Sequence, residues 1–347
     1  MRLLKNNKAS SKNFNHTYFL IIFLTLNLLI TSAFAQNYLK KNSGNSFETK
    51  RFDWNYKNRE YSIIGDLSRA IYNQYKKRSR FRNYDLFASD KFDDILIQQL
   101  AESLQDLGKK SGFNELEIAY LAVSFVQALP YTSDDVTTGF DEYPRFPYET
   151  LFDGGGDCED TSILAVALLK ELGFGAVLIA FDDHMGVGVA CDKSITGYHY
   201  KDRGIRYCYL ETTGKNWSPG LLPSKYQRKT AQIIHVYKKP ALDINFKTQY
   251  EYNTITLLAS VDVVINNLGS ETAKNIKVYV SLQTEDITKV WDRIESDVFN
   301  LEPEGTYSFG VNNLKAPSGA KLRVRVLARA DNANPKEVYS KWLSWSK

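Results

Sequence analysis

A glycine-rich turn that runs directly into an apolar segment constrains this 347-residue chain more than any other feature. The three glycines at 154–156 allow the backbone to turn sharply, and a helix is predicted from about Cys158 to Gly173. Cys158 would then lie in the first helical turn, where outward-pointing N–H groups and the helix dipole favour a thiolate. The alternative is a small buried cysteine on a core helix, and the segment alone leaves both interpretations open.

Residues 1–35 have the pattern of a secretory signal peptide. A basic region precedes an apolar stretch at 18–30, and Ala-Phe-Ala at 33–35 supplies the small residues of a cleavage site. We therefore predict export to the periplasm, the cell surface or the medium, with a mature chain that begins at Gln36. The alternative is an uncleaved membrane anchor at 17–35, which approaches the roughly 20 residues that a spanning helix needs.

The positive charge of the chain belongs to this N-terminal segment. The formal net charge of +4 falls to zero once its four basic residues are removed, so nucleic-acid binding is not expected. One basic cluster remains, and we interpret it as a solvated helix end, with an anionic cell-envelope partner as the alternative. Its members are Lys76, Lys77, Arg78, Arg80 and Arg82.

Hydrophobic periodicity predicts an α+β fold for the first two parts of the mature chain. Residues 36–112 form a helical lead-in that starts with paired extended segments at 52–56 and 60–64, followed by helices at 66–78 and 93–109. Residues 113–239 form the next domain, with Asn114 as the N-cap of a helix, a loop at 131–152 and the helix at Cys158. Four strands of an antiparallel sheet complete it, with the helices packed on that sheet. We expect them at 176–181, 184–191, 205–212 and 232–237.

Residues 240–347 alternate apolar and polar side chains over several short segments separated by turn signals. This pattern predicts a β-sandwich of immunoglobulin-like type. No cluster of catalytic residue types occurs in it, so we expect a structural or adhesive role and association with the cell envelope.

Period-two alternation brings a histidine and a glutamate together. His184 opens a predicted strand, while Glu211 lies on the same face as Tyr209 of a second strand. If the two strands pair, His184 and Glu211 share one face, with open space beside His184 at Gly186 and Gly188. An imidazole is a natural partner for a carboxylate in such apolar surroundings.

Gly156-Asp157-Cys158-Glu159-Asp160, His184 and Tyr209-Leu210-Glu211-Thr212-Thr213 together resemble the transglutaminase-like superfamily of papain-type cysteine enzymes. The resemblance covers roughly residues 116–217 and implies Cys158 as nucleophile, His184 as base and Glu211 as orienting acid. It also implies Gln127 and the Cys158 backbone N–H as oxyanion donors. The substrate would be a protein or peptide whose amide is hydrolysed or transferred.

The chain departs from the superfamily pattern at its acidic position, where Glu211 replaces the more usual aspartate. Because the superfamily includes inactive members, a non-catalytic binding or structural module of the cell envelope is the main alternative. Tyr143, Phe146, Tyr148 and Trp217 are candidates for substrate contact and equally for packing.

No cofactor and no metal are expected. A metal site built from Cys158, Asp182, Asp183 and His184 is a weaker alternative, since the sequence has no CxxC or HxxxH spacing. In an oxidising compartment the three cysteines allow one disulfide, Cys191–Cys208, with Cys158 left as a thiol.

Overall fold

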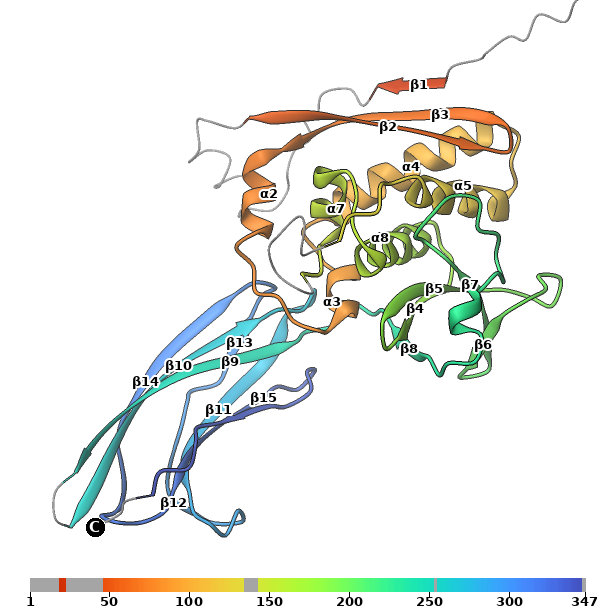
Figure 1. The fold of residues 1–347 in the computed structure, drawn as a ribbon. Helices are drawn as coiled ribbons and strands as arrows, with labels where there is room; N and C mark the ends of the chain where they lie inside the picture. Colours follow the sequence, from red (N-terminus) through yellow and green to blue (C-terminus); the bar gives the residue numbers. More distant parts are fainter. Residues whose placement is uncertain (1–18, 23–45, 134–142, 253–254, 345–347) are drawn as a thin grey trace, which may run out of the picture.

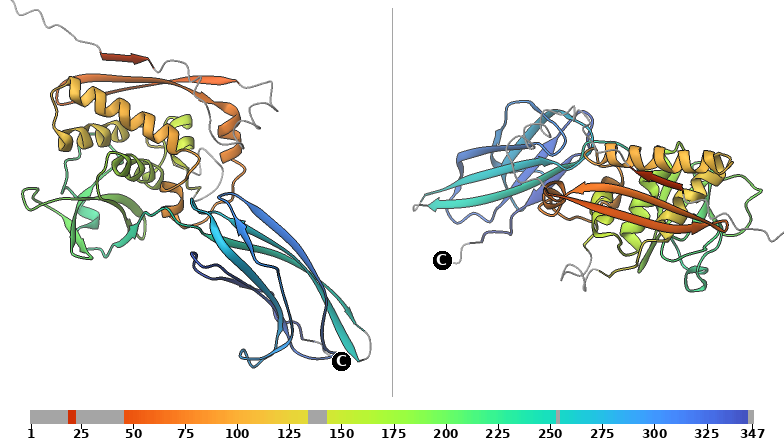
Figure 2. Two further views of the ribbon diagram at one scale, coloured as in Figure 1. Left: turned by 180° about the vertical axis from the view of Figure 1, so that it is seen from behind. Right: turned by 90° about the horizontal axis from the view of Figure 1, so that it is seen from above.

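The computed structural model describes residues 19–22, 46–133, 143–252 and 255–344, which build two large hydrophobic cores and a smaller cluster around Ile179 and Tyr209 of the first sheet (Figure 1). The first core is formed by helices and sheet between Trp54 and Val236, and the second by strands from Leu242 onward. Figure 2 shows the second body projecting from one end of the first. The fold is therefore a mixed helix-and-sheet body followed by an all-strand body.

A long hairpin covers one side of the first body. Strands β2 (Phe47–Tyr56) and β3 (Arg59–Ser68) pair antiparallel through a two-residue turn at Lys57 and Asn58, both with positive φ. The hairpin is longer than predicted, so the helix expected from residue 66 begins only after β3 ends. Strand β1 (Phe19–Ile22) pairs parallel with β3, while the remainder of the predicted signal peptide lies outside the described residues.

Six helices of the first body are described, and their boundaries follow local sequence signals. They are α2 (Arg69–Tyr75), α3 (Tyr84–Ala88), α4 (Asp94–Lys110), α5 (Glu115–Gln127), α7 (Pro147–Asp153) and α8 (Cys158–Glu171). The predicted capping box of α5 is present, with Asn114 and Glu117 bonded reciprocally. The prediction of a loop throughout 131–152 was wrong, because Pro147 occupies the first helical position, where it needs no N–H partner.

The sheet of the first body is antiparallel, as predicted. Its strand order is β6-β7-β5-β4-β8, and the short strand β6, which was not predicted, forms one edge. The strands are β4 (Ala176–Phe181), β5 (His184–Ala190), β6 (His199–Asp202), β7 (Ile205–Leu210) and β8 (Gln232–His235). The apolar helix α8 lies between this sheet and α4 and α5, so it is packed on both sides (Figure 1).

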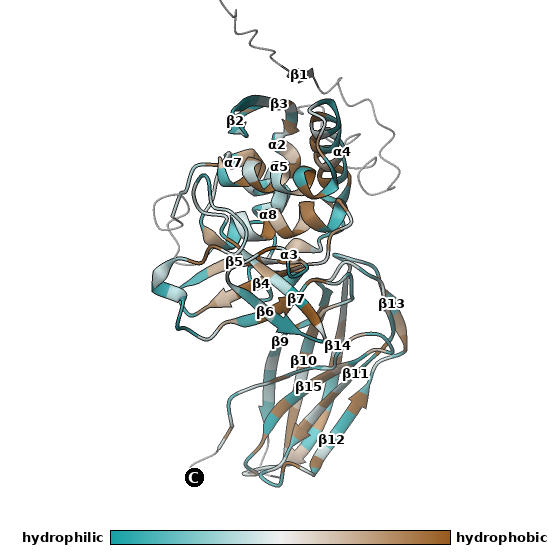
Figure 3. Ribbon diagram, turned by 90° about the vertical axis from the view of Figure 1, so that its right-hand side faces the viewer, coloured by the Kyte–Doolittle hydropathy of each residue, from teal (hydrophilic) through white to brown (hydrophobic). Residues whose placement is uncertain are grey.

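Two sheets enclose the second core. One has the order β14-β10-β9, and the other β12-β11-β15-β16 with β13 beside β11. The strands alternate apolar and polar residues, which Figure 3 shows as alternating brown and teal segments. Their bounds are β9 (Leu242–Tyr252), β10 (Thr256–Asn267), β11 (Ala273–Gln283), β12 (Val290–Glu295), β13 (Phe299–Leu301), β14 (Thr306–Pro317), β15 (Arg323–Arg329) and β16 (Lys336–Tyr339).

Arg78 connects the two bodies. Its contacts, and those of Arg80, show that the interpretation of the basic cluster as a solvated helix end was wrong for these two residues. Its guanidinium binds Asp90 at 2.8 Å and also pairs with Glu304, in a turn of the second body. Arg80 pairs with buried Glu149 at 2.7 Å. These two arginines therefore form internal ion pairs, which a solvated helix end would not have. Across the described ranges, no helix is both long and apolar enough to span a membrane.

Candidate active site

Cys158 is the first residue of α8, as the glycine-rich turn predicted. Asp157 caps the helix by accepting a hydrogen bond from the Asp160 N–H, and the Asp160 carboxylate reciprocates. A side chain at Gly156 would collide with Asp160, so the tight approach of the turn to the helix requires glycine there. The thiol is half-buried and is not part of a disulfide.

Hydrogen bonds hold the first turn of α8 against the ends of β5 and β7. The Thr212 hydroxyl, just beyond β7, lies 3.0 Å from the hydroxyls of both Thr161 and Ser162. Ser162 also donates to the backbone carbonyl of Met185 at 3.2 Å. Since Met185 and Thr212 adjoin His184 and Glu211, these contacts hold the first turn of α8, which Cys158 begins, against the strand ends that carry both residues.

His184 and Glu211 form a direct contact. The His184 Nε2 atom lies 2.9 Å from Glu211 Oε2, and the Glu211 side chain is 1% exposed. Burial alone would raise the pKa of Glu211, but hydrogen bonds from His184 and Thr213 outweigh it and leave the pKa below its usual value. Within the described residues Nδ1 of His184 makes no hydrogen bond, and it is the nitrogen left to receive a proton.

Two tyrosines that were not selected from the sequence complete the histidine's surroundings. The Tyr209 hydroxyl lies 3.2 Å from His184 Nε2 and donates to Glu211 Oε2 at 3.0 Å. The Tyr226 ring stacks on the imidazole, with centroids 4.6 Å apart. The expectation of open space at Gly186 and Gly188 was wrong. A side chain at Gly186 would collide with the Tyr209 ring, and one at Gly188 would crowd Val177. These contacts fix the plane of the imidazole.

The electrostatics of the thiol oppose the effect expected from the helix start alone. Burial raises the pKa of Cys158 well above its usual value, and the adjacent Glu159 carboxylate raises it further. The thiol donates a hydrogen bond to Glu159 Oε2 at 2.8 Å. A backbone hydrogen bond from Met185 acts in the opposite direction but is outweighed. In this conformation burial and Glu159 favour the protonated thiol, despite the position of Cys158 at a helix start.

Gln127 braces the site and is not available as an oxyanion donor in this geometry. It ends α5, and its Nε2 donates to the backbone carbonyls of Glu211 at 2.9 Å and Trp217 at 3.0 Å. Both amide hydrogens are thus used. The contacts tie α5 to the loop after β7 and leave the Cys158 backbone N–H as the candidate donor.

A buried arginine fixes the segment that precedes α7. Arg145 is 1% exposed and pairs with Asp160, which is fully buried, and with Asp153 at 3.2 Å. Of the aromatic candidates, Phe146 and Tyr148 are buried in the core, which favours packing over substrate contact.

Cys191 and Cys208 are joined by a disulfide, the pairing that the cysteine count allowed. It links the end of β5 to β7, the two strands that lead to His184 and Glu211. Asp183, a member of the alternative metal set, instead binds Lys225 at 2.6 Å and Lys229 at 3.0 Å.

Comparisons with known proteins give only distant similarities. No protein-family profile matches the chain, and no curated protein does. Among solved structures, red sea bream transglutaminase aligns at 10% identity over 90% of this chain and 63% of its own, with a TM-score of 0.23. A protein described as ApaA from Bordetella pertussis aligns at 17% identity over 30% of this chain and 93% of its own, with a TM-score of 0.22. A DUF3823 family protein from Bacteroides ovatus aligns at 13% identity over 49% of this chain and 87% of its own, with a TM-score of 0.21. At such TM-scores these similarities carry no argument about function.

Proposed function

We propose that the chain is an exported, transglutaminase-like cysteine enzyme that acts on amide bonds through Cys158, His184 and Glu211. The observation that carries the proposal is the 2.9 Å contact between His184 Nε2 and buried Glu211, at strand ends that are hydrogen-bonded to the first turn of the helix that Cys158 begins. A nucleophile, a base and an orienting acid in this order are what thiol catalysis requires.

The reaction begins when the Cys158 proton moves to His184 Nδ1 and the sulfur attacks an amide carbonyl carbon. The Cys158 backbone N–H stabilises the oxyanion, and His184 returns the proton to the nitrogen as the carbon–nitrogen bond breaks. The amine leaves and a thioester remains. Water or a second amine then attacks the thioester, and the Cys158 thiol is restored. Glu159 must release the thiol before the first step, because its hydrogen bond holds the proton on sulfur.

Two further parts of the proposal concern location. A signal peptide at 1–35 would deliver the protein to an oxidising compartment, and the Cys191–Cys208 disulfide supports this because such bonds are rare in the cytosol. The two-sheet body would be an immunoglobulin-like sandwich that associates with the cell envelope.

A second candidate function is a non-catalytic transglutaminase-like module for binding or structure. The observation that favours it is the Glu159 carboxylate, which accepts a hydrogen bond from the thiol and adds to burial in raising the pKa of Cys158. A protein that only used this fold for assembly would tolerate such an arrangement.

Alkylation of Cys158 by chloroacetamide at pH 7 separates the two functions. We expect His184→Ala to slow alkylation about tenfold or more, since the imidazole would no longer accept the thiol proton. The control is His199→Ala, which removes an exposed histidine in β6 and should leave the rate unchanged. Equal rates in wild type and His184→Ala would refute the thiol–imidazole pair and favour the non-catalytic module.

A further inference from the structure

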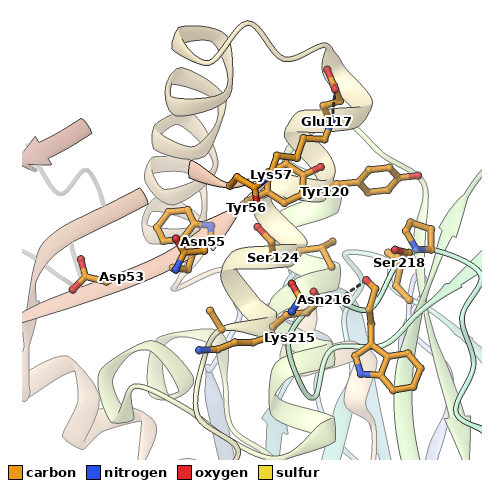
Figure 4. A pocket seen from close by; sticks show the side chains of 18 residues that line it. Asp53, Asn55, Tyr56, Lys57, Glu117, Tyr120, Ser124, Lys215, Asn216 and Ser218 are labelled. Atoms are coloured by element: carbon orange, nitrogen blue, oxygen red, sulfur yellow. Dashed lines mark hydrogen bonds and ion pairs between the residues drawn. The ribbon is translucent and has the colours of Figure 1, made fainter. Parts of the chain in front are cut away.

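A large cavity lies beside the candidate site between three segments that are distant in the sequence (Figure 4). Its volume is about 840 Å3, within the range of ligand-binding pockets. The turn end of the β2–β3 hairpin forms one wall, one face of α5 the second, and residues 215–219 the third. Figure 4 shows Tyr120 and Ser124 of α5 facing the loop that carries Asn216 and Ser218.

A second cavity of about 530 Å3 adjoins the first and is lined by residues of the segments 127–131 and 213–215. The two share Gln127, Ala128 and Lys215 as lining residues, so they form one groove. At its other end the groove is lined by Tyr131 and Thr213. Thr213 binds the Glu211 carboxylate at 2.7 Å, and Tyr131 pairs with Gly156, two residues before Cys158.

The lining of the larger cavity fits an uncharged, bulky side chain. Tyr56, Tyr120 and Trp217 supply aromatic surface, and Val123 and Leu210 supply aliphatic surface. Lys57 and Glu117 at its edge neutralise each other in an ion pair, Asp53 is paired with Arg51, and Lys215 is the remaining charged residue of the lining. Hydroxyl and amide groups on the remaining wall can bond to a peptide backbone. They belong to Asn55, Asn58, Ser124, Asn216 and Ser218.

We propose that this groove binds the polypeptide substrate, with a large apolar or aromatic side chain in the 840 Å3 cavity and the backbone leading through the smaller one to Cys158. The inference rests on the proposed function and adds to it a substrate class. It also gives the N-terminal hairpin a role, since the hairpin supplies a wall of the specificity cavity.

A series of electrophilic peptides that differ in the position of one phenylalanine tests binding in the groove separately from the reactivity of Cys158. The peptides are chloroacetyl-pentaglycine amides in which one glycine is replaced by phenylalanine, at a different position in each peptide. The all-glycine peptide and chloroacetamide are the references. In each case the Cys158 sulfur displaces chloride, and mass spectrometry of the intact protein gives the rate. We expect one phenylalanine position to be alkylated about tenfold faster than the all-glycine peptide, which corresponds to about 1.4 kcal/mol.

Two variants of α5 connect that preference to the cavity. Ser124→Trp fills the cavity and Tyr120→Ala removes an aromatic wall, and each should bring the ratio of the two peptide rates close to 1. Leu116→Trp is the matched control, because Leu116 is exposed on the same helix and does not line the cavity. Thermal unfolding of each variant checks that it is folded.

The outcomes separate the groove from the reaction. Equal rates for all peptides, with normal alkylation by chloroacetamide, would overturn the groove and leave the proposed enzyme standing. A phenylalanine preference that survives in both Ser124→Trp and Tyr120→Ala would also overturn it. Failure of chloroacetamide to alkylate Cys158 at any pH would remove the proposed function, and the groove as a substrate site with it.

Discussion

The carboxylate of Glu159 adds to burial in opposing the loss of the Cys158 proton. It accepts the thiol hydrogen bond at 2.8 Å and, after burial, is the next cause of the raised pKa of Cys158. Glu159→Gln should lower that pKa. Alkylation by iodoacetamide at pH 7 should then become about tenfold faster for each unit by which the pKa falls. The pH dependence of the alkylation rate measures the change. Glu171→Gln at the far end of α8 is the control, and equal rates for the two variants would exclude Glu159 as the cause.

Part of the free energy of unfolding depends on pH, because it depends on the ionisation of Glu211. Its pKa in the folded protein lies below the ordinary value of 4.5, so its contribution is present above that value and is lost as pH falls through the lower folded pKa. Glu211→Gln should destabilise the protein by roughly 1–3 kcal/mol at pH 7. The difference from wild type should shrink in urea titrations below about pH 4.

The matched control for that titration is Glu102→Gln on the exposed face of α4, which should stay within about 0.5 kcal/mol of wild type at both pH values. A Glu211→Gln difference that is the same at pH 7 and at low pH would mean that the ionised carboxylate is not the stabilising form.

The residues at the candidate site could be selected from the sequence to different degrees. Period-two alternation predicted that His184 and Glu211 share one face, because side chains of a strand point alternately to its two faces and both residues lie at strand ends. The same alternation placed Tyr209 on that face, so its contact with both residues was within reach. Tyr226 was not, because its stacking on His184 depends on a long loop and a short 3-10 turn at Ser224–Tyr226. Nor was the Glu159 contact, which depends on a side-chain rotamer.

At the scale of elements, a buried ion pair fixes the segment before α7 to the start of α8. Arg145→Ala would leave the fully buried Asp160 without its cation, which typically costs about 3–5 kcal/mol. Arg51→Ala breaks an Arg–Asp pair whose side chains are more than half exposed and should cost less than about 1 kcal/mol. Urea unfolding of both variants measures the contrast, and similar losses would mean that Asp160 is satisfied without Arg145.

Element prediction succeeded where local signals dominated and failed where tertiary contacts did. The apolar stripe of α4 and the four main strands could be predicted from the hydrophobic period of the sequence, and the capping box of α5 from its residue types. The start of α2 was placed too early, because pairing with β2 extends β3 through Ser68. Helix α7 was missed, since a proline-rich segment was interpreted as a loop although Pro147 can begin a helix.

At the scale of the whole molecule, the periodicity of the sequence changes near residue 240, and the two large hydrophobic cores lie on either side of that position. How the bodies join could not be predicted, because the join depends on single long-range pairs. Arg78 contacts Asp90 and Glu304, and Lys239 pairs with Asp85. Charged residues at such positions have the same local sequence signal as solvated ones.

The number of free thiols before and after reduction reports which of the three cysteines form a disulfide. Cys191 and Cys208 form the disulfide and Cys158 remains a thiol, so the denatured, unreduced protein should contain one reactive thiol and the reduced protein three. Reduction should also lower the free energy of unfolding by about 3 kcal/mol, because the bond closes a loop across 17 positions and restricts the unfolded chain.

Cys158→Ser is the control for this count, with no thiol before reduction and two after it, and the same loss of stability on reduction. Three thiols in the unreduced protein, recovered from an oxidising compartment, would show that the bond does not form. That result would remove the strongest support for export, because the disulfide is a feature that a reducing cytosol would not maintain. A single thiol would identify Cys158 as the only cysteine able to act as a nucleophile, which is what the proposed mechanism requires.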